Sequence, residues 1–146
     1  MTKRKVCFLL LSLLLLACGK GGDYEQMHEH LMKAKAQNEN YEPFVSDSMM
    51  LSVADYFDRN GTANEKIMAH YLLGCVYRDL GDMPRSLECY HQAVGKADTT
   101  DADCDYLLLG KVHGQMAYIY NKELLPQYQL EQLHHCRRYS LLAGDT

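Results

Sequence analysis

Residues 67–100 read IMAHYLLGCVYRDLGDMPRSLECYHQAVGKADTT, and this stretch carries the clearest structural pattern in the chain. It contains two helical patterns that meet at Gly81-Asp82. In both halves, apolar and small residues recur at steps of three and four, which places one stripe on one face of each helix. Gly74, Ser86 and Ala93 lie within these stripes. Small side chains there allow two antiparallel helices to pack near the lower end of the usual range of about 8–10 Å.

The same stretch resembles a tetratricopeptide repeat (TPR), whose motif has Leu-Gly, then Tyr, a Gly-Asp turn, a small residue, an aromatic residue and Ala. The matching residues are Leu73, Gly74, Tyr77, Gly81, Asp82, Ser86, Tyr90 and Ala93. Two positions depart from the motif, because His70 stands at the large aromatic position and Asp98 at the closing Pro. The resemblance implies a helical hairpin that stacks with others into an α-solenoid. The alternative is a generic helical hairpin.

A second, weaker match spans residues from about 110 to 143. Ala117 and Tyr120 occupy packing positions of the motif, but the turn at residues 122–126 lacks Gly-Asp. Residues 63–146 are therefore predicted to hold two TPR-like repeats, 67–100 and about 110–143. Residues 23–62 carry two further helical patterns, which we interpret as a divergent helical hairpin. The predicted fold is all-α, an α-solenoid of about three antiparallel hairpins after a signal-peptide helix.

Capping residues predict where two of these helices begin and end. The second helix is expected to be capped by Ser46 or Asp47, and to stop at Gly61 in a left-handed conformation. Thr62 and Glu65 have the spacing of a capping box, which predicts the start of the third helix.

Residues 1–22, MTKRKVCFLLLSLLLLACGKGG, have the layout of an export signal. Basic residues precede an apolar run over residues 6–17, which is shorter than the about 20 residues of a membrane-spanning helix. Residues 15–19, LLACG, resemble a bacterial lipobox. That resemblance implies that residues 1–17 are a lipoprotein signal peptide and that Cys18 becomes the lipid-bearing first residue, carrying palmitate. Residues 18–22 are then expected to form a flexible tether. The alternatives are a simple secretory signal and an uncleaved anchor.

The charge of the chain bears on its partners. The 146 residues carry a formal net charge of −4. Loss of residues 1–17 removes three of the 15 basic residues, which leaves 12 against 19 acidic ones, a net charge of −7. A protein with this charge is repelled by nucleic-acid backbones and anionic lipid surfaces, so neither is expected as its main partner.

No motif for catalysis is present in the sequence, which lacks a phosphate-binding Gly-rich loop, a nucleophile elbow and the His-Glu-x-x-His zinc motif. His28 and His30 are two residues apart, so a helix directs them about 200° apart and they do not share a metal ion easily. We therefore predict no enzymatic activity, no cofactor and no metal site.

Four cysteines follow Cys18: Cys75, Cys89, Cys104 and Cys136. Cys75 and Cys136 lie at or beside small packing positions, which favours free buried thiols. An exported protein can also form disulfides, and Cys75 with Cys89 is then the pair to test first.

In the TPR family, ligands lie in a concave groove lined by the first helix of each hairpin. The resemblance implies groove positions at Met68, Tyr71, Cys75, Arg78 and Asp79 in one repeat and at Lys111, Gly114, Tyr118, Asn121 and Lys122 in the next. An aromatic and basic groove suits a peptide with apolar and acidic groups, and the alternative is an ordinary solvated face. Cys75 and Tyr118 replace the paired Asn of the subclass that grips a terminal carboxylate, so that subclass is excluded.

Together these features resemble a TPR lipoprotein of Bacteroidetes type. The predicted role is a non-catalytic scaffold in the cell envelope that presents a concave surface to a protein or peptide. One alternative is that the chain is the exported sensor region of a longer TPR-containing membrane signalling regulator, truncated after Thr146. Another is a glycan-binding lipoprotein. Proteins of that kind need long inserted loops, and the longest connection predicted here is Lys96–Asp103.

Overall fold

The computed structural model describes residues 3–144, with side chains for residues 21–144, and every regular element in this range is an α-helix. The helices are α1 Lys3–Glu39, α2 Ser48–Asn60, α3 Ala63–Asp79, α4 Met83–Gly95, α5 Tyr106–Lys122 and α6 Pro126–Leu142. The predicted all-α fold class is confirmed.

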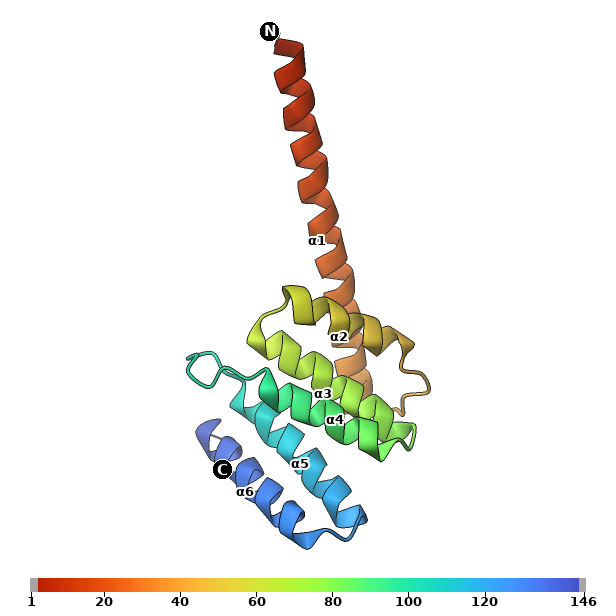
Figure 1. The fold of residues 1–146 in the computed structure, drawn as a ribbon, viewed down its shortest axis with the longest axis vertical. Coiled ribbons are helices and arrows are strands. Elements are labelled where there is room, and N and C mark those ends of the chain that lie inside the picture. Colours follow the sequence, from red (N-terminus) through yellow and green to blue (C-terminus); the bar gives the residue numbers. More distant parts are fainter. Residues whose placement is uncertain (1–2, 145–146) are drawn as a thin grey trace.

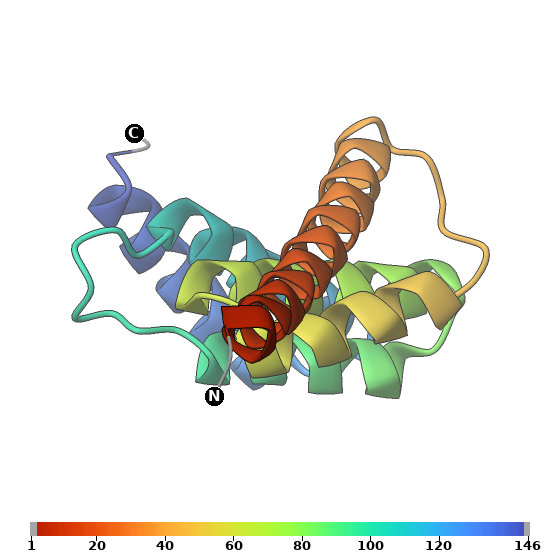
Figure 2. The ribbon, with the colours of Figure 1, turned by 90° about the horizontal axis from the view of Figure 1, so that it is seen from above.

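Each helix packs against the next one along the chain (Figure 1). Helix α3 is central, since it contacts α1, α2, α4 and α5, whereas α6 packs on α5. The N-terminal half of α1 projects beyond the other helices, and the connection that follows α1 bulges outward at the edge of the molecule (Figure 2). The last turns of α1 therefore belong to the packed body of the protein.

A close contact between α3 and α4 explains the small residues in residues 67–100. A Cβ atom at Gly74 would lie 2.4 Å from Cε1 of Tyr90, so only glycine leaves room for this ring. The Tyr90 side chain is fully buried. The Ser86 hydroxyl, also buried, donates a hydrogen bond to the Gly74 carbonyl oxygen at 2.8 Å. Glycine and serine thus bring the two helices together and satisfy a backbone acceptor that faces the interface.

The turn between α3 and α4 follows from its sequence. Gly81 has a φ of +80°, a left-handed conformation that glycine adopts without strain. The Asp82 carboxylate then accepts a hydrogen bond from the Arg85 N–H at 3.0 Å and caps α4. A short turn of this kind sets the two helices antiparallel.

The predicted start of α3 is confirmed, because Thr62 and Glu65 form a complete capping box. The two predictions for α2 have different outcomes. Its start is placed correctly, because Asp47 is the N-cap residue and the Ser46 hydroxyl accepts a hydrogen bond from the Ser48 N–H at 3.4 Å, whereas the left-handed conformation expected at Gly61 is wrong. Asp47 precedes α2 but makes no capping hydrogen bond, and its carboxylate instead accepts one from the Tyr77 hydroxyl at 3.2 Å. Gly61 is extended, with φ −88° and ψ 161°, and not left-handed. Glycine is needed there for space, since a Cβ atom would lie 2.8 Å from the Phe57 ring.

Aromatic side chains join α5 to α6. Tyr106, His113 and Tyr120 recur every seven residues on α5 and stack on Tyr139, His135 and Tyr128 of α6, with ring centroids 6.1, 4.8 and 5.4 Å apart. His113 Nδ1 lies 2.7 Å from the Gln132 side-chain oxygen, and burial lowers the pKa of this imidazole. The ring is therefore neutral at pH 7 and acts as part of the packed interface.

Helix α1 continues through residues 18–22, where the sequence predicted a flexible tether. Each glycine in a helix interior costs about 1 kcal/mol relative to alanine, so this glycine-rich stretch is intrinsically the weakest part of α1. Residues 1–2 of the expected signal peptide, the Cys18 side chain and residues 145–146 lie outside what the structure describes. Within the described part of the chain, none of the helices has the length and apolar character needed to cross a membrane.

We predict that Gly74→Ala lowers the free energy of unfolding by about 1–3 kcal/mol, because the new methyl group overlaps the Tyr90 ring. Urea unfolding followed by circular dichroism measures this change. Gly95→Ala, where the added Cβ atom meets open space, is the matched control and should be neutral or stabilising. Equal loss in both variants would contradict the packing described for α3 and α4.

Candidate functional site

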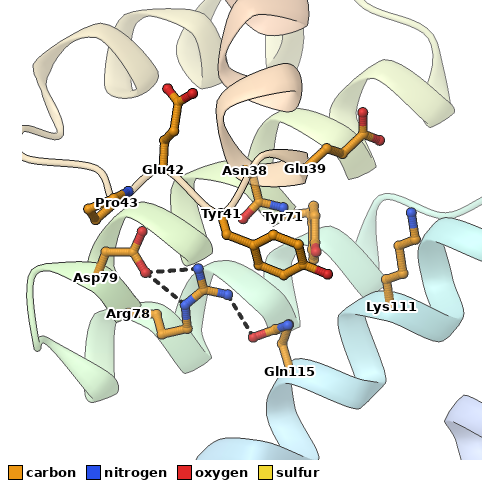
Figure 3. Close-up of a pocket in the computed structure, with 10 residues that line it drawn as sticks. All are labelled: Asn38, Glu39, Tyr41, Glu42, Pro43, Tyr71, Arg78, Asp79, Lys111 and Gln115. Carbon is orange, nitrogen blue, oxygen red and sulfur yellow. Dashed lines mark hydrogen bonds and ion pairs between the residues drawn. The ribbon is translucent and has the colours of Figure 1, made fainter.

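A pocket of about 420 Å³ lies where the end of α1 and the connection after it approach α3 and α5 (Figure 3). Its lining residues are Asn38, Glu39, Tyr41, Glu42, Pro43, Tyr71, Arg78, Asp79, Lys111 and Gln115. Three separate segments of the chain thus contribute to one concave surface. We call it the α1–α3–α5 pocket.

A hydrogen-bond network holds the floor of this pocket together. Arg78 donates from Nε to Asp79 Oδ1 at 2.9 Å and from Nη1 to the Gln115 side-chain oxygen on α5 at 2.9 Å (Figure 3). Asp79 Oδ2 accepts a hydrogen bond from the Phe44 backbone N–H at 3.1 Å, and the Phe44 side chain is buried. The network therefore connects α3 to α5 and to the connection after α1.

The positive charge of Arg78 is compensated within this network by the Asp79 carboxylate. Burial opposes its charged form, but neighbouring groups, among them the Asp79 carboxylate that accepts its hydrogen bond, outweigh that effect and raise the pKa of the guanidinium. The Arg78 Nη2 atom lies 2.8 Å from Asp79 Oδ1, and both side chains are largely shielded from solvent. A partly shielded pair of this kind positions its neighbours and leaves little charge for a ligand.

Tyr71 and Cys75 on α3 remain uncharged beside the pocket. Burial raises the pKa of the Tyr71 hydroxyl and that of the Cys75 thiol. Tyr71 is 7% exposed and Cys75 is fully buried. They supply a neutral hydroxyl and an inert thiol. A charged ligand would therefore have to pair with other side chains of the pocket.

Two charged groups available to a ligand are Lys111 and Glu42. Both side chains are exposed, and neither has an ion-pair partner among residues 21–144. Glu39, which also lines the pocket, has Lys35 at 4.0 Å. That exposed pair leaves most of the Glu39 charge in place. The pocket thus presents one cation from α5 and two anions, Glu42 on the connection after α1 and Glu39 at the end of α1.

Tyr41 lies on the connection after α1 and lines the pocket. Its backbone is left-handed, with φ 59°, which costs a residue with a Cβ atom about 1–2 kcal/mol. Its side chain is 94% exposed, and the hydroxyl end points toward α5, where Lys111 and Gln115 lie (Figure 3). The left-handed residue closes the end of α1 as a helix C-cap and leaves the aromatic ring exposed at the mouth of the pocket, where it can cover an apolar ligand group.

Of the groove residues expected from the sequence, Cys75 is fully buried, and the structure divides the others into two groups. Tyr71, Arg78, Asp79 and Lys111 line the α1–α3–α5 pocket, and Met68 lines a small adjoining hollow of about 30 Å³ shared with Tyr71 and Lys111. The second group is further along α5 and does not line the pocket: Gly114, Tyr118, Asn121 and Lys122. There the Lys122 Nζ atom lies 5.5 Å from the centre of the Tyr118 ring.

The residues that the sequence assigned to repeat packing lie in interfaces between helices or in turns. Buried members are Leu73, Gly74, Tyr77, Ser86, Tyr90, Ala93 and Ala117. Tyr120 is partly buried against Tyr128, and Gly81 forms the exposed turn before α4. None of them lines the pocket, so packing and ligand positions are on different faces of the helices.

Sequence reasoning missed the contribution of residues 38–43. Within the later hairpins, α3–α4 and α5–α6, the connections span three residues, 80–82 and 123–125, whereas residues 40–47 form a longer one between α1 and α2. The extra length of this connection, together with Pro43, could have indicated that it contributes to the lining of a pocket. Tyr41 gave no such signal, because glycine or asparagine is the usual residue in a left-handed position.

Another hollow, also of about 420 Å³, lies on the outer side of α6 and is lined by His134, Arg137, Arg138, Leu141 and Leu142. All of these residues come from one helix, and α6 leaves several leucines exposed nearby. This surface brings no distant segments together, so we regard it as a less specific site than the α1–α3–α5 pocket.

The cysteines at positions 75, 89, 104 and 136 are free thiols. Cys75 is buried as expected and so is Cys89, but Cys136, expected to be buried, is only partly so. Burial raises the pKa of the Cys89 thiol to about 12. Among the described residues, no group of three or more His, Cys, Asp and Glu side chains is arranged to hold a metal ion.

No protein-family model, curated protein or solved structure matches this chain. The resemblance to tetratricopeptide repeats therefore rests on the motif residues and their spacing.

Proposed function

We propose that this protein is a non-catalytic, lipid-anchored scaffold of TPR type that binds a peptide segment of another protein. The observation that carries the proposal is the α1–α3–α5 pocket, which is built from the first helix of each expected hairpin. A concave surface shared by several rigid helices positions side chains more accurately than a loop does.

The repeat architecture in this proposal is an α-solenoid of three hairpins, α1–α2, α3–α4 and α5–α6. It is supported by contacts between consecutive helices and by the Gly74, Ser86 and Tyr90 contact at the family spacing. In a solenoid, each hairpin buries its apolar face only against its neighbours. The first helices then lie side by side, as the contacts of α3 with α1 and α5 support.

The chemistry of the pocket supports a peptide as ligand. Tyr41 offers a large, rigid aromatic surface at low entropic cost, and Lys111 and Glu42 add opposite charges to the lining of the pocket. The Asn38 and Gln115 amides can donate and accept hydrogen bonds, as a peptide backbone requires. The pocket is open to solvent, so an extended segment can pass through it.

The anchor in this proposal is a lipid on Cys18, inferred from the lipobox-like residues 15–19. Each buried methylene of an acyl chain contributes about 0.8 kcal/mol, so two or more chains hold a protein stably at a membrane surface. The protein then presents its pocket within the cell envelope, facing either the periplasm or the surface of the outer membrane.

To test binding at the pocket, Lys111 is replaced by the photo-crosslinker p-benzoylphenylalanine in the full chain produced in cells. We expect light-dependent adducts with another protein, because Lys111 is exposed and lines the pocket. The same crosslinker at Glu88, an exposed position on α4, is the matched control and should give no such adduct. Equal adduct yields at both positions, or none at Lys111, would rule out the pocket as the binding surface.

The anchor is tested by metabolic labelling with radioactive palmitate. The wild-type chain is expected to take up label, and Cys18→Ser is expected to take up none, because the hydroxyl cannot replace the lipidated thiol. Labelling of both chains to the same extent would remove Cys18 from the proposal, and Cys7→Ser, inside the expected signal peptide, serves as the control that keeps its label.

A further inference from the structure

We infer that the α1–α3–α5 pocket selects peptide segments in which an apolar or aromatic side chain lies between one acidic and one basic side chain. This inference rests on the proposed function and names the chemistry of its ligand. Three features carry it: the exposed ring of Tyr41, the separate positions of Lys111 and Glu42, and the internal neutralisation of Arg78.

The backbone of Tyr41 is fixed by hydrogen bonds, although its side chain is exposed to solvent. The Tyr41 N–H donates to the Asn38 carbonyl oxygen at 3.2 Å, and the Glu42 N–H donates to the Gln37 carbonyl oxygen at 3.0 Å. These bonds close the end of α1 and fix the left-handed backbone at φ 59°. The ring, 94% exposed, is therefore presented by a rigid backbone and covers an apolar ligand group at little entropic cost.

The connection after α1 is anchored on both sides of Tyr41. The Gln37 side-chain amide donates a hydrogen bond to the Pro43 carbonyl oxygen at 3.1 Å, and the next residue, Phe44, is buried and bonded to Asp79. Glu42 is thus carried on a segment pinned to α1 and to α3. The backbone that carries Glu42 therefore has a defined place beside the pocket.

The charges of the pocket are separated in space. Figure 3 shows Glu42 on the connection after α1, with its side chain directed away from the Tyr41 ring, and Lys111 on α5 on the other side of that ring, with Glu39 at the end of α1. Arg78 and Asp79 form an ion pair, so together they add no net charge to the pocket. A ligand with two acidic groups would meet repulsion at Glu42, and one with two basic groups would meet repulsion at Lys111. Only a ligand with one charge of each sign is matched at both.

The test is a selection of phage-displayed random dodecapeptides on the full chain purified in mild detergent. Enriched peptides should carry an acidic and a basic residue on opposite sides of an apolar or aromatic residue. The strongest peptide is then synthesised with fluorescein and titrated by fluorescence anisotropy. Lys111→Glu and Glu42→Lys should each weaken its binding about tenfold, because each turns one attraction into repulsion. Changing the acidic residue of the peptide to Lys should restore binding to Lys111→Glu but not to Glu42→Lys.

Tyr41→Gly separates recognition from folding. Glycine relieves the left-handed backbone, so this variant should unfold at higher urea concentration yet bind the peptide about tenfold more weakly. Leu124→Gly is the matched control, since Leu124 is the other exposed left-handed residue, with φ 57° in the turn after α5. It should gain stability in the same way and bind the peptide as the wild type does.

Two outcomes overturn the inference. Enriched peptides without this charge pattern, or peptides whose affinity is unchanged by Lys111→Glu and Glu42→Lys, would refute it while leaving peptide binding in place. A library that enriches no sequence on the wild-type chain would refute the proposed function as well.

Discussion

The close contact of Gly74 with the Tyr90 ring determines how the central helices of this protein pack. A side chain at position 74 would overlap the ring, and the ring itself is fully buried, so neither partner can move aside. Ser86 completes the contact by satisfying the Gly74 carbonyl oxygen. With α4 seated in this way, the opposite side of α3 is left to meet α1 and α5, and that is where the pocket forms.

The pocket illustrates how pairing of charges decides which of them a ligand can use. Arg78 looks like a binding residue in the sequence, but its guanidinium is engaged by Asp79 and Gln115. Lys111 and Glu42, which carry no such partners in the described part of the chain, keep their charges for a ligand. The buried network therefore shapes the pocket, and its exposed rim supplies the specificity that we propose.

The helices could be predicted from the sequence because their causes are local: an apolar period of three to four residues, and the Thr62 to Glu65 capping box. The conformation of Gly61 was predicted wrongly. Glycine can be required for a left-handed backbone or for space, and the sequence does not distinguish the two; here it makes room for the Phe57 ring. The wall of the pocket could not be predicted. It depends on a hydrogen bond from Phe44 to Asp79, 35 residues away, and on a left-handed tyrosine that no local pattern favours.

The most direct test of this account is a nuclear magnetic resonance titration of the isotope-labelled full chain with the strongest displayed peptide. The account predicts that the largest changes in amide chemical shift fall on residues 38–42, on Arg78 and Asp79, and on Lys111 and Gln115. Residues on the outer side of α6, such as Leu130 and Leu141, should keep their shifts. The largest changes on α6, with residues 38–42 unaffected, would contradict the central claim that the α1–α3–α5 pocket is the binding surface.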